Sequence, residues 1–425
     1  MTVMLILLLL VALMALGLPI AWCFAAVLAV LTLIFDTNID ILMLQGFRSL
    51  NSIVLIALPL FILTGYLMEA SGLATRLLEL TTRMAHGRGR LGATIVLASA
   101  VFGAIAGTAT AAVAAMGTMI AGPAREQGYA PGYTAALLGV SSLLGILFPP
   151  SITLILFAVV TRQSVAALFA ATIGPALLLI IGLLIYNSIA VRRLDIPPQA
   201  PATTPVSTTI LRALPAIFMP VLILGGIYGG VFTPTEAAGV AAMATLLIGV
   251  FIYRSLNIAS LSRSLVLTAQ TTGSIIMILL FSFMISRVLA TERIPQDISD
   301  IVQSLIDNRL MALLLVNVIL IAAGALMDDL SVTVVIAPLF LPAMSANGID
   351  PVHFAAIVAC SVVIGSNSPP VAPILYMASK VVGAPVSQAM RASMGIITFV
   401  ALPVLVVTSL WPDLSLALPR WLGLM

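Results

Sequence analysis

Two adjacent carboxylates, Asp328 and Asp329, lie inside a long apolar stretch, and Ser331 and Thr333 follow them. A charged side chain at membrane depth costs about 2.5 to 3.5 kcal/mol on insertion scales, so these groups need a counter-ion or water. Na⁺ suits them because a hard cation prefers oxygen ligands. Protonation is the alternative, and the sequence leaves both open. Consecutive residues point to different sides, so it is also open which aspartate faces a cation.

Two pairs of prolines, Pro149-Pro150 and Pro369-Pro370, interrupt other apolar stretches. Each pair removes two backbone donors and disfavours helix at the preceding residue, so we expect Phe148 and Ser368 at breaks in their helices. A break exposes carbonyl groups, which protein, a cavity or a cation must satisfy at membrane depth. Secondary transporters build midplane ion and substrate sites in this way. The alternative is that the prolines only kink their helices.

Small residues mark the centre of the apolar stretch 93–122, at Gly103, Gly107, Thr108 and Thr110. Arginines stand on both sides of this stretch, with Arg90 before it and Arg125 after it, and the positive-inside rule assigns both sides to the cytoplasm. The stretch must then enter and leave on one side, as a re-entrant hairpin or a tight helix pair does. A cation at its tip would rely on neutral oxygens.

Few charged side chains in the spans could bind an anionic substrate. Arg287 could clamp a carboxylate if it faced a cavity, although snorkelling to the interface or pairing with Glu292 explains it equally well. Lys380 is better explained as a topology anchor, and Glu69 as an interface charge. Glu236 follows Thr233 at the spacing of a helix-capping box, which favours a structural role.

The composition determines what class of protein carries these residues. The chain has 425 residues, of which 61% are hydrophobic and 8% charged, and this excludes an ordinary soluble protein. Two cysteines, Cys23 and Cys360, and two histidines, His86 and His353, provide no disulfide framework, metal site or proton relay. No nucleotide-binding loop, protease signature or dinucleotide fingerprint is present, so we expect neither an enzyme nor a cofactor other than a coupling ion.

The predicted fold is an all-α integral membrane protein. Residues 1–35 carry no charge and are read as two retained spans meeting near Pro19 rather than as a removable signal. Length alone allows about ten spanning helices. The apolar stretches are 2–17, 19–35, 50–70, 93–122, 132–160, 165–190, 212–230, 231–253, 268–290, 309–346, 350–380 and 392–412.

An internal repeat organises these stretches. Gly128, Pro131, Ser141, Gly145 and Pro149-Pro150 recur 220 residues later as Gly348, Pro351, Ser361, Gly365 and Pro369-Pro370. Each half contains three spans, a hairpin and two more spans, the first of these broken at the proline pair. Because five crossings is an odd number, the second half is expected upside down relative to the first. A chance match of frequent small residues is the alternative.

The repeat sets the predicted domain boundaries. The first half covers 1–194, with scaffold spans in 2–70, the hairpin 93–122, the broken helix 132–160 and the span 165–190. A cytoplasmic linker, 195–211, rich in Pro, Thr and Ser, joins it to the second half, 212–425. That half contains spans within 212–290, the hairpin 309–346, the broken helix 350–380 and the span 392–412. The segment 296–308 is predicted to be an amphipathic surface helix, with a solvated loop as the alternative.

Seven short motifs in series are similar to the large membrane (M) subunit of the tripartite ATP-independent periplasmic (TRAP) transporters, the DctM-like permeases. They are Gly65-Tyr-Leu-Met-Glu-Ala-Ser-Gly72, Phe102-Gly-Ala-Ile-Ala-Gly-Thr108, Gly145-Ile-Leu-Phe-Pro-Pro-Ser151, Phe232-Thr-Pro-Thr-Glu-Ala-Ala-Gly239, Ile294-Pro-Gln296, Gly348-Ile-Asp-Pro-Val-His-Phe354 and Pro369-Pro-Val371. The resemblance covers nearly the whole chain. It implies a multi-pass protein of the bacterial inner membrane that imports small organic acids with Na⁺, or with H⁺, by an elevator motion. It also implies two partners, a small membrane subunit of about four spans and a periplasmic substrate-binding protein.

The resemblance also implies two cation sites. The first falls on Gly103, Gly107, Thr108, Pro149, Pro150 and Ser151; the second falls on Asp328, Thr333, Gly365, Ser366, Asn367, Ser368, Pro369 and Pro370. The run Ser366-Asn367-Ser368 departs from the family's apolar-apolar-Thr pattern. Asn367 therefore joins Arg287 as a substrate candidate, and Ser151 is a third. Sialic acid, other sugar acids, sulfonates and keto acids stand beside C4-dicarboxylates.

Two other functions are compatible with parts of this pattern. A self-sufficient cation-coupled anion carrier would need no binding protein, and partner dependence distinguishes it from a TRAP permease. A channel is disfavoured because hairpins entering from opposite sides would close the centre rather than leave a continuous pore.

Overall fold

The computed structural model describes residues 9–10, 12–13, 16, 18–84, 89–193, 206–305, 308–369 and 371–425. All regular secondary structure in these residues is helical. Most of the first predicted span, 2–17, most of the linker, 195–205, and Pro370 lie outside the described residues. Eight described helices are long and apolar enough to cross a membrane, or up to nine if one bent pair counts as a single span.

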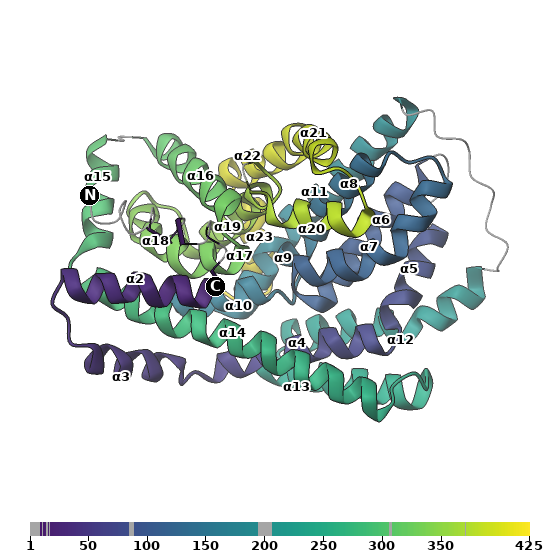
Figure 1. Cartoon of the computed structure of the whole chain (residues 1–425), viewed down its shortest axis with the longest axis horizontal. Helices are drawn as coiled ribbons and strands as arrows, with labels where there is room; N and C mark the ends of the chain where they lie inside the picture. Colours follow the sequence, from purple (N-terminus) through teal and green to yellow (C-terminus); the bar gives the residue numbers. More distant parts are fainter. Residues whose placement is uncertain are drawn as a thin grey trace.

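One part of the molecule is a layer of long helices that lie together along the lower edge of Figure 1. Within it α4 packs against α13 and α14, and α14 also packs against α2 and α3. The layer, here called the scaffold layer, consists of α2 (Ile20–Ile34), α3 (Ile39–Leu50), α4 (Ile53–Ala70), α12 (Val206–Tyr228), α13 (Pro234–Leu247) with the π-helix η1 (Ile248–Ile252), and α14 (Ile258–Thr291).

The other part, here called the hairpin body, contains shorter and broken helices from both halves of the sequence. Its first-half elements are α6 (Arg90–Ala106), α7 (Ala109–Glu126), α8 (Pro131–Ser142), α9 (Leu144–Leu147), α10 (Ile152–Thr161) and α11 (Val165–Arg193). Its second-half elements are α16 (Arg309–Leu326), α17 (Asp329–Ser331), η2 (Val332–Ile336), α18 (Ala337–Ala346), α19 (Pro351–Gly365), α20 (Pro373–Val382), α21 (Val386–Ile396), η3 (Ile397–Ala401), α22 (Leu402–Leu410) and α23 (Asp413–Trp421).

The two sets of helices in the hairpin body interlock. Helix α8 packs against α20 and α21, α7 packs against α20, and α11 packs against α19 and α23. Arg125 strengthens one of these contacts, because its guanidinium donates a 3.0 Å hydrogen bond to the carbonyl of Val382 at the end of α20. The body is therefore one packed unit built from both halves of the chain.

Two amphipathic helices stand at opposite ends of the molecule, α5 (Leu73–Met84) on the right of Figure 1 and α15 (Ile294–Leu305) on the left. Helix α5 packs between α12 of the scaffold layer and α6 of the hairpin body, and α15 packs against α18. Within the segment predicted as an amphipathic helix over 296–308, residues 296–305 are therefore helical rather than a loop, and residues 306–307 lie outside the described residues. Helices α3, α5 and α23 were not predicted, because each is short and carries two or three charged residues.

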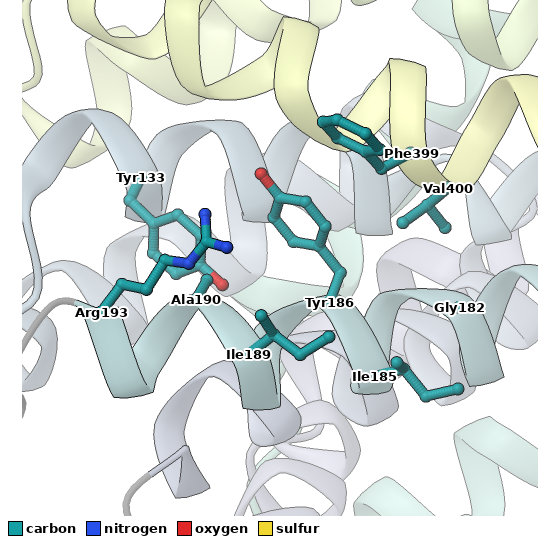
Figure 2. A pocket seen from close by; sticks show the side chains of 9 residues that line it. All are labelled: Tyr133, Gly182, Ile185, Tyr186, Ile189, Ala190, Arg193, Phe399 and Val400. Carbon is teal, nitrogen blue, oxygen red and sulfur yellow. The ribbon is translucent and has the colours of Figure 1, made fainter.

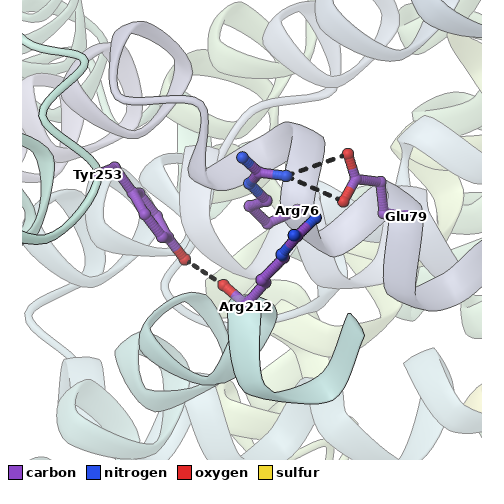
Figure 3. Close-up of polar contacts among 4 residues, drawn as sticks. All are labelled: Arg76, Glu79, Arg212 and Tyr253. Carbon is purple, nitrogen blue, oxygen red and sulfur yellow. Dashed lines mark hydrogen bonds and ion pairs between the residues drawn. The ribbon is translucent and has the colours of Figure 1, made fainter. Parts of the chain in front are cut away.

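Polar contacts fix the end of the scaffold layer beside α5 (Figure 3). Arg76 and Glu79 form an ion pair at 3.2 Å along α5, and the Tyr253 hydroxyl donates a 2.6 Å hydrogen bond to the carbonyl of Arg212. Ser255 also donates to the carbonyl of Ser71 at 2.8 Å, which joins the end of α4 to the residues after η1. Both halves of the sequence thus contribute to this end of the layer.

Two predicted details of this layer have clear outcomes. The capping box at Thr233 and Glu236 is confirmed, since the Thr233 amide donates to the Glu236 carboxylate at 2.8 Å and the Glu236 amide donates to the Thr233 hydroxyl at 3.3 Å. Helix α14 begins ten residues before the predicted boundary at 268, because Asn257 and Ser260 form another capping box that starts it early.

Candidate functional site

The first hairpin consists of α6 and α7, and its tip is the turn at Gly107 and Thr108. Gly107 has φ of +66°, a left-handed conformation that favours glycine, and its carbonyl accepts a 3.2 Å hydrogen bond from the amide of Ile152. Behind the tip, a Cβ added to Gly103 would lie 2.5 Å from the Cα of Gly145. Only glycine permits this approach, so the tip rests backbone to backbone on the broken helix.

The broken helix bends by 44° between Leu147 and Ile152. Phe148 is extended, with φ of −85° and ψ of 125°, and the Ser151 hydroxyl caps α10 by accepting from the amide of Leu154 at 3.4 Å. Because Pro149 and Pro150 have no N–H, the carbonyls four residues before them receive no helical hydrogen bond. The break therefore leaves backbone oxygens beside the hairpin tip.

The second hairpin has α16 as one arm and the run of α17, η2 and α18 as the other, and its tip is at Met327 and Asp328. It also packs closely on a helix end, since a Cβ added to Gly324 would lie 3.3 Å from the Cα of Gly365 at the end of α19. Ser368 and Pro369 lie in the non-helical segment that follows, between α19 and α20. Each hairpin tip thus sits against an interrupted helix.

The two adjacent aspartates have different surroundings. Asp329 accepts a 2.8 Å hydrogen bond from the hydroxyl of Thr153 on α10. Asp328 instead lines a cavity, and its Oδ1 is buried without a hydrogen-bond partner in the described part of the chain. Of the two carboxylates, Asp328 is therefore the one with free ligand capacity.

Further buried oxygens without a hydrogen-bond partner among the described residues occur near this tip, in η2 and at the end of α19, which pack together. They belong to Thr333 in η2 and to Ser366 just after α19, and the amide oxygen of Asn367, which lies against Gly139 of α8, is a third. A buried polar group left unpaired costs about 1 to 3 kcal/mol, so several within one region favour a bound species that they coordinate. Hydroxyl, amide and carboxylate oxygens together are the donor set that a hard cation prefers.

A cavity of ≈ 500 Å³ separates the scaffold layer from both hairpin tips. Its walls are apolar at Ile20, Ile62, Phe102, Ile152 and Ile278, among others. Its polar lining is Tyr66, Glu69, Thr108, Thr110, Thr271, Ser274 and Asp328, and the hydroxyls of Tyr66 and Thr271 are 2.9 Å apart. No Arg, Lys or His is among the described residues that line it. The cavity is thus mainly apolar, carries a few oxygen atoms and adjoins both tips.

The three substrate candidates from the sequence lie away from this lining. Arg287 is exposed on α14, and Ser151 is buried as the cap of α10. The Asn367 amide is buried against α8, where its nitrogen lies 3.5 Å from the carbonyl of Gly139. Sequence reasoning missed Tyr66, Thr271 and Ser274, and it treated Glu69 as an interface charge. A signal for this wall existed, because Ile62, Tyr66 and Glu69 recur at helical spacing on one face of α4.

Comparisons with known proteins identify the family. The model of the family described as "Tripartite ATP-independent periplasmic transporter, DctM component" matches residues 7–414. The chain belongs to this family. It is the large membrane permease component of such a transporter and a multi-pass protein of the bacterial inner membrane. The predicted resemblance is therefore confirmed.

Relatives in this DctM family have different named substrates. The chain is 36% identical over 387 residues to the C4-dicarboxylate TRAP transporter large permease DctM of Pseudomonas aeruginosa, covering 90% of each protein. It is 30% identical over 407 residues to the sialic acid permease SiaM of Vibrio cholerae, covering 95% of each. It is 31% identical to the 2,3-diketo-L-gulonate permease YiaN of Escherichia coli, covering 96% of this chain and 97% of that one. These relatives are permeases rather than enzymes.

A solved structure with the same fold is the YdaH transporter of Alcanivorax borkumensis. The TM-score is 0.60 at 13% identity, and the match covers 87% of each chain. This similarity concerns the fold alone.

Proposed function

We propose that this chain is the permease subunit of a Na⁺-coupled secondary importer of small organic acids, and that it moves its substrate by an elevator motion. The observation that carries the proposal is the group of unpartnered oxygens at the Asp328 tip, next to a cavity between the hairpin tips and the scaffold layer. A coupled importer needs a cation site and a substrate site in contact, and this arrangement supports the proposal because the candidate sites adjoin each other.

The inverted repeat is part of the proposal, and the helix bounds support it. Helix α6 starts at Arg90 and α16 at Arg309, which is 219 residues later. Helix α8 starts at Pro131 and α19 at Pro351, a difference of 220, and α10 starts at Ile152 and α20 at Pro373, a difference of 221. The close glycine pairs follow the same offset, since 324 − 103 is 221 and 365 − 145 is 220. Symmetry-related sites are typical of transporters built in this way.

We infer that the second cation site uses Asp328, Thr333 and the helix end from Gly365 to Ser368, followed by the proline pair Pro369 and Pro370. The Asp328 carboxylate would supply charge, and the Thr333 and Ser366 hydroxyls would replace water ligands. The first site would use the Gly103 to Thr108 turn with Pro149, Pro150 and Ser151, where all ligands are neutral. H⁺ in place of Na⁺ is the competing coupling ion.

The substrate is proposed to bind in the cavity of ≈ 500 Å³. An organic acid brings negative charge to a wall that already carries Glu69 and Asp328 and has no basic side chain among its described residues. Cations bound at the hairpin tips would offset this charge, which makes anion binding depend on cation binding. Hydroxyl groups at Tyr66, Thr271 and Ser274 suit carboxylate or sugar oxygens.

In the elevator motion the hairpin body moves and the scaffold layer stays fixed. The body is packed as one unit across both halves, and the cavity lies between its tips and the layer, beside direct contacts of α4 with α6 and α10. Helices α5 and α15 connect the two parts at opposite ends of Figure 1. The family's tripartite organisation supports a small membrane subunit and a periplasmic binding protein as partners of this chain.

The first test is thermal unfolding of the purified chain in NaCl, KCl and choline chloride at equal ionic strength. Na⁺ at ten times its Kd should add about 1.4 kcal/mol of stability. Asp328→Ala should remove part of this gain, whereas Asp413→Ala, which removes an exposed carboxylate paired with Arg420, should retain all of it. Equal midpoints in the three salts would contradict Na⁺ coupling through this chain.

The second test measures uptake of radiolabelled C4-dicarboxylates, sialic acid and 2,3-diketo-L-gulonate in proteoliposomes with both partner proteins. We expect uptake to require an inward Na⁺ gradient and the binding protein. Uptake without the binding protein would instead support a self-sufficient carrier.

A further inference from the structure

A groove of ≈ 620 Å³ lies between helices of the hairpin body and shares no lining residue with the transport cavity. Figure 2 shows α11 along one wall and the segment with Phe399 and Val400, from η3, along the other. Tyr133 of α8 lies at the end of the groove near Arg193. Neither the cation sites nor the proposed substrate site uses these residues.

The groove follows α11 from Gly182 to Arg193. At Gly182 the two walls meet, since a Cβ added there would lie 2.7 Å from a methyl group of Val400. Eleven residues of helix from there to Arg193 span about 16 Å, at a rise of about 1.5 Å per residue. The hydrocarbon core of a bilayer is about 30 Å thick, so the groove is as long as one leaflet is deep.

Most of the groove is apolar and open. Ile185, Ile189 and Phe399 are 55%, 51% and 73% exposed, and both walls belong to candidate membrane spans. In a membrane such side chains face lipid chains rather than water. The body of the groove therefore suits a hydrocarbon chain.

One end of the groove is positively charged. Arg193 ends α11 and is exposed, and no ion pair of Arg193 is found among the described residues. The Tyr186 hydroxyl also makes no hydrogen bond in the described part of the chain, and Figure 2 shows it pointing between the walls. The arginines at this end of α11 assign it to the cytoplasmic side. A cation at the end of a hydrocarbon groove matches an amphiphile with a negative head.

We propose that this groove binds one anionic phospholipid of the cytoplasmic leaflet. Its phosphate contacts Arg193, with the Tyr186 hydroxyl as a second donor, and one acyl chain lies along Ile189 and Phe399. Basic pockets between spanning helices on the cytoplasmic side are suited to anionic head groups. The site depends on neither the coupling ion nor the identity of the transported substrate.

The neighbouring arginine provides a matched control. Arg192 is also exposed at the end of α11, but it lines a different cavity together with Gly89 and Asn187. Arg192→Gln and Arg193→Gln therefore remove the same charge from adjacent residues, and only the second affects the groove.

The experiment uses the full chain in detergent, depleted of lipid, and titrates it with phosphatidylglycerol or phosphatidylcholine of the same acyl chains, or with inorganic phosphate. Binding is followed by native mass spectrometry and by the unfolding midpoint. We expect phosphatidylglycerol to bind most tightly. Arg193→Gln should weaken it at least about fivefold, the equivalent of one arginine near an anionic surface, and Arg192→Gln should leave it within about twofold. Ala190→Leu, which fills the groove, should weaken both lipids.

Each of the following results would overturn the proposal. Equal effects of Arg192→Gln and Arg193→Gln would mean that net charge, not the groove, attracts the lipid. Equal binding of the two lipids would mean that the site does not recognise the anionic head group. Equal stabilisation by inorganic phosphate alone would mean that the acyl chain does not contribute to binding. Loss of the phosphatidylglycerol effect when the small membrane subunit is present would mean that this subunit, not a lipid, occupies the groove. If Arg193→Gln does not fold, the same lipid titration of Ala190→Leu tests the proposal. Unchanged lipid binding to Ala190→Leu would exclude the groove as the binding site.

Discussion

The hydroxyl of Thr153 on α10 donates a 2.8 Å hydrogen bond to the carboxylate of Asp329 on α17, although 176 residues separate them in sequence. This bond joins the broken helix of the first half to the hairpin tip of the second half. It also occupies one of two adjacent aspartates, and among the described residues Oδ1 of Asp328 is the oxygen of this pair that is buried at the cavity without a partner. The pair thus orients the tip as well as connecting the halves.

Thr153→Val should therefore destabilise the protein without removing the cation site. The substitution keeps the shape of the side chain but leaves a partly buried carboxylate oxygen without its donor, which costs about 1 kcal/mol. We expect a lower unfolding midpoint and an unchanged Na⁺-dependent increase. Thr161→Val, whose hydroxyl donates only within its own helix to the carbonyl of Phe157, serves as control. A normal midpoint together with lost Na⁺ dependence would reverse the roles given to these residues.

Replacement of each aspartate by asparagine distinguishes the roles of the two carboxylates in Na⁺ binding. Asp328→Asn removes the charge that faces the cavity. The apparent Na⁺ affinity, measured from the Na⁺-dependent stabilisation, should therefore fall by at least about tenfold. Asp329→Asn retains an oxygen that can accept from Thr153, so the affinity should change by less than about threefold. Na⁺ titrations of the unfolding midpoint measure both. The opposite ranking would place the cation on Asp329.

The glycine contacts behind the tips predict a steep cost for one added methyl group. In Gly103→Ala the new Cβ would lie 2.5 Å from the Cα of Gly145, and backbone atoms cannot move aside as a flexible side chain can. We expect a loss of about 2 kcal/mol or more, in the range of overpacked cores, and defective transport.

Gly122→Ala is the control in the same hairpin, because nothing lies within 4 Å of its added Cβ. Alanine is the better helix former by about 1 kcal/mol, so this variant should be neutral or slightly more stable. Denaturant unfolding of the two variants gives the comparison. Equal stabilities would show that the Gly103 contact yields easily.

Local rules predicted the features that depend on neighbours in sequence. The break at Pro149-Pro150 follows from missing N–H groups, and the turn at Gly107 follows from its small neighbours. The capping box at Thr233 is equally local. These features required no knowledge of distant parts of the chain.

Features that depend on packing were not predictable in this way. The cavity wall combines Tyr66 of α4 with Thr271 of α14, 205 residues away, and no pattern in one segment reports that contact. Arg287 illustrates the converse. It lies nine residues after Ile278 of the cavity wall, and at about 100° per residue this is half a turn around the helix, on the opposite face. Arg287 was a substrate candidate because of its charge, but its position on α14 directs its side chain away from the cavity.

The last prediction concerns the hydroxyl pair of this wall. Tyr66→Phe removes one hydroxyl and keeps the ring, and Thr271→Val removes the other at nearly constant volume. If the pair contacts the substrate, each variant should raise KM for uptake about 5-fold to 20-fold, the loss of one to two hydrogen bonds, while the Na⁺-dependent unfolding midpoint stays unchanged. Tyr228→Phe, which removes a buried hydroxyl from a residue outside the cavity lining, is the matched control and should leave KM unaltered. Because Tyr66 and Thr271 bond to each other, the double variant should lose less than the sum of the single losses. Unchanged KM in both single variants would mean that the substrate contacts the hairpin tips alone.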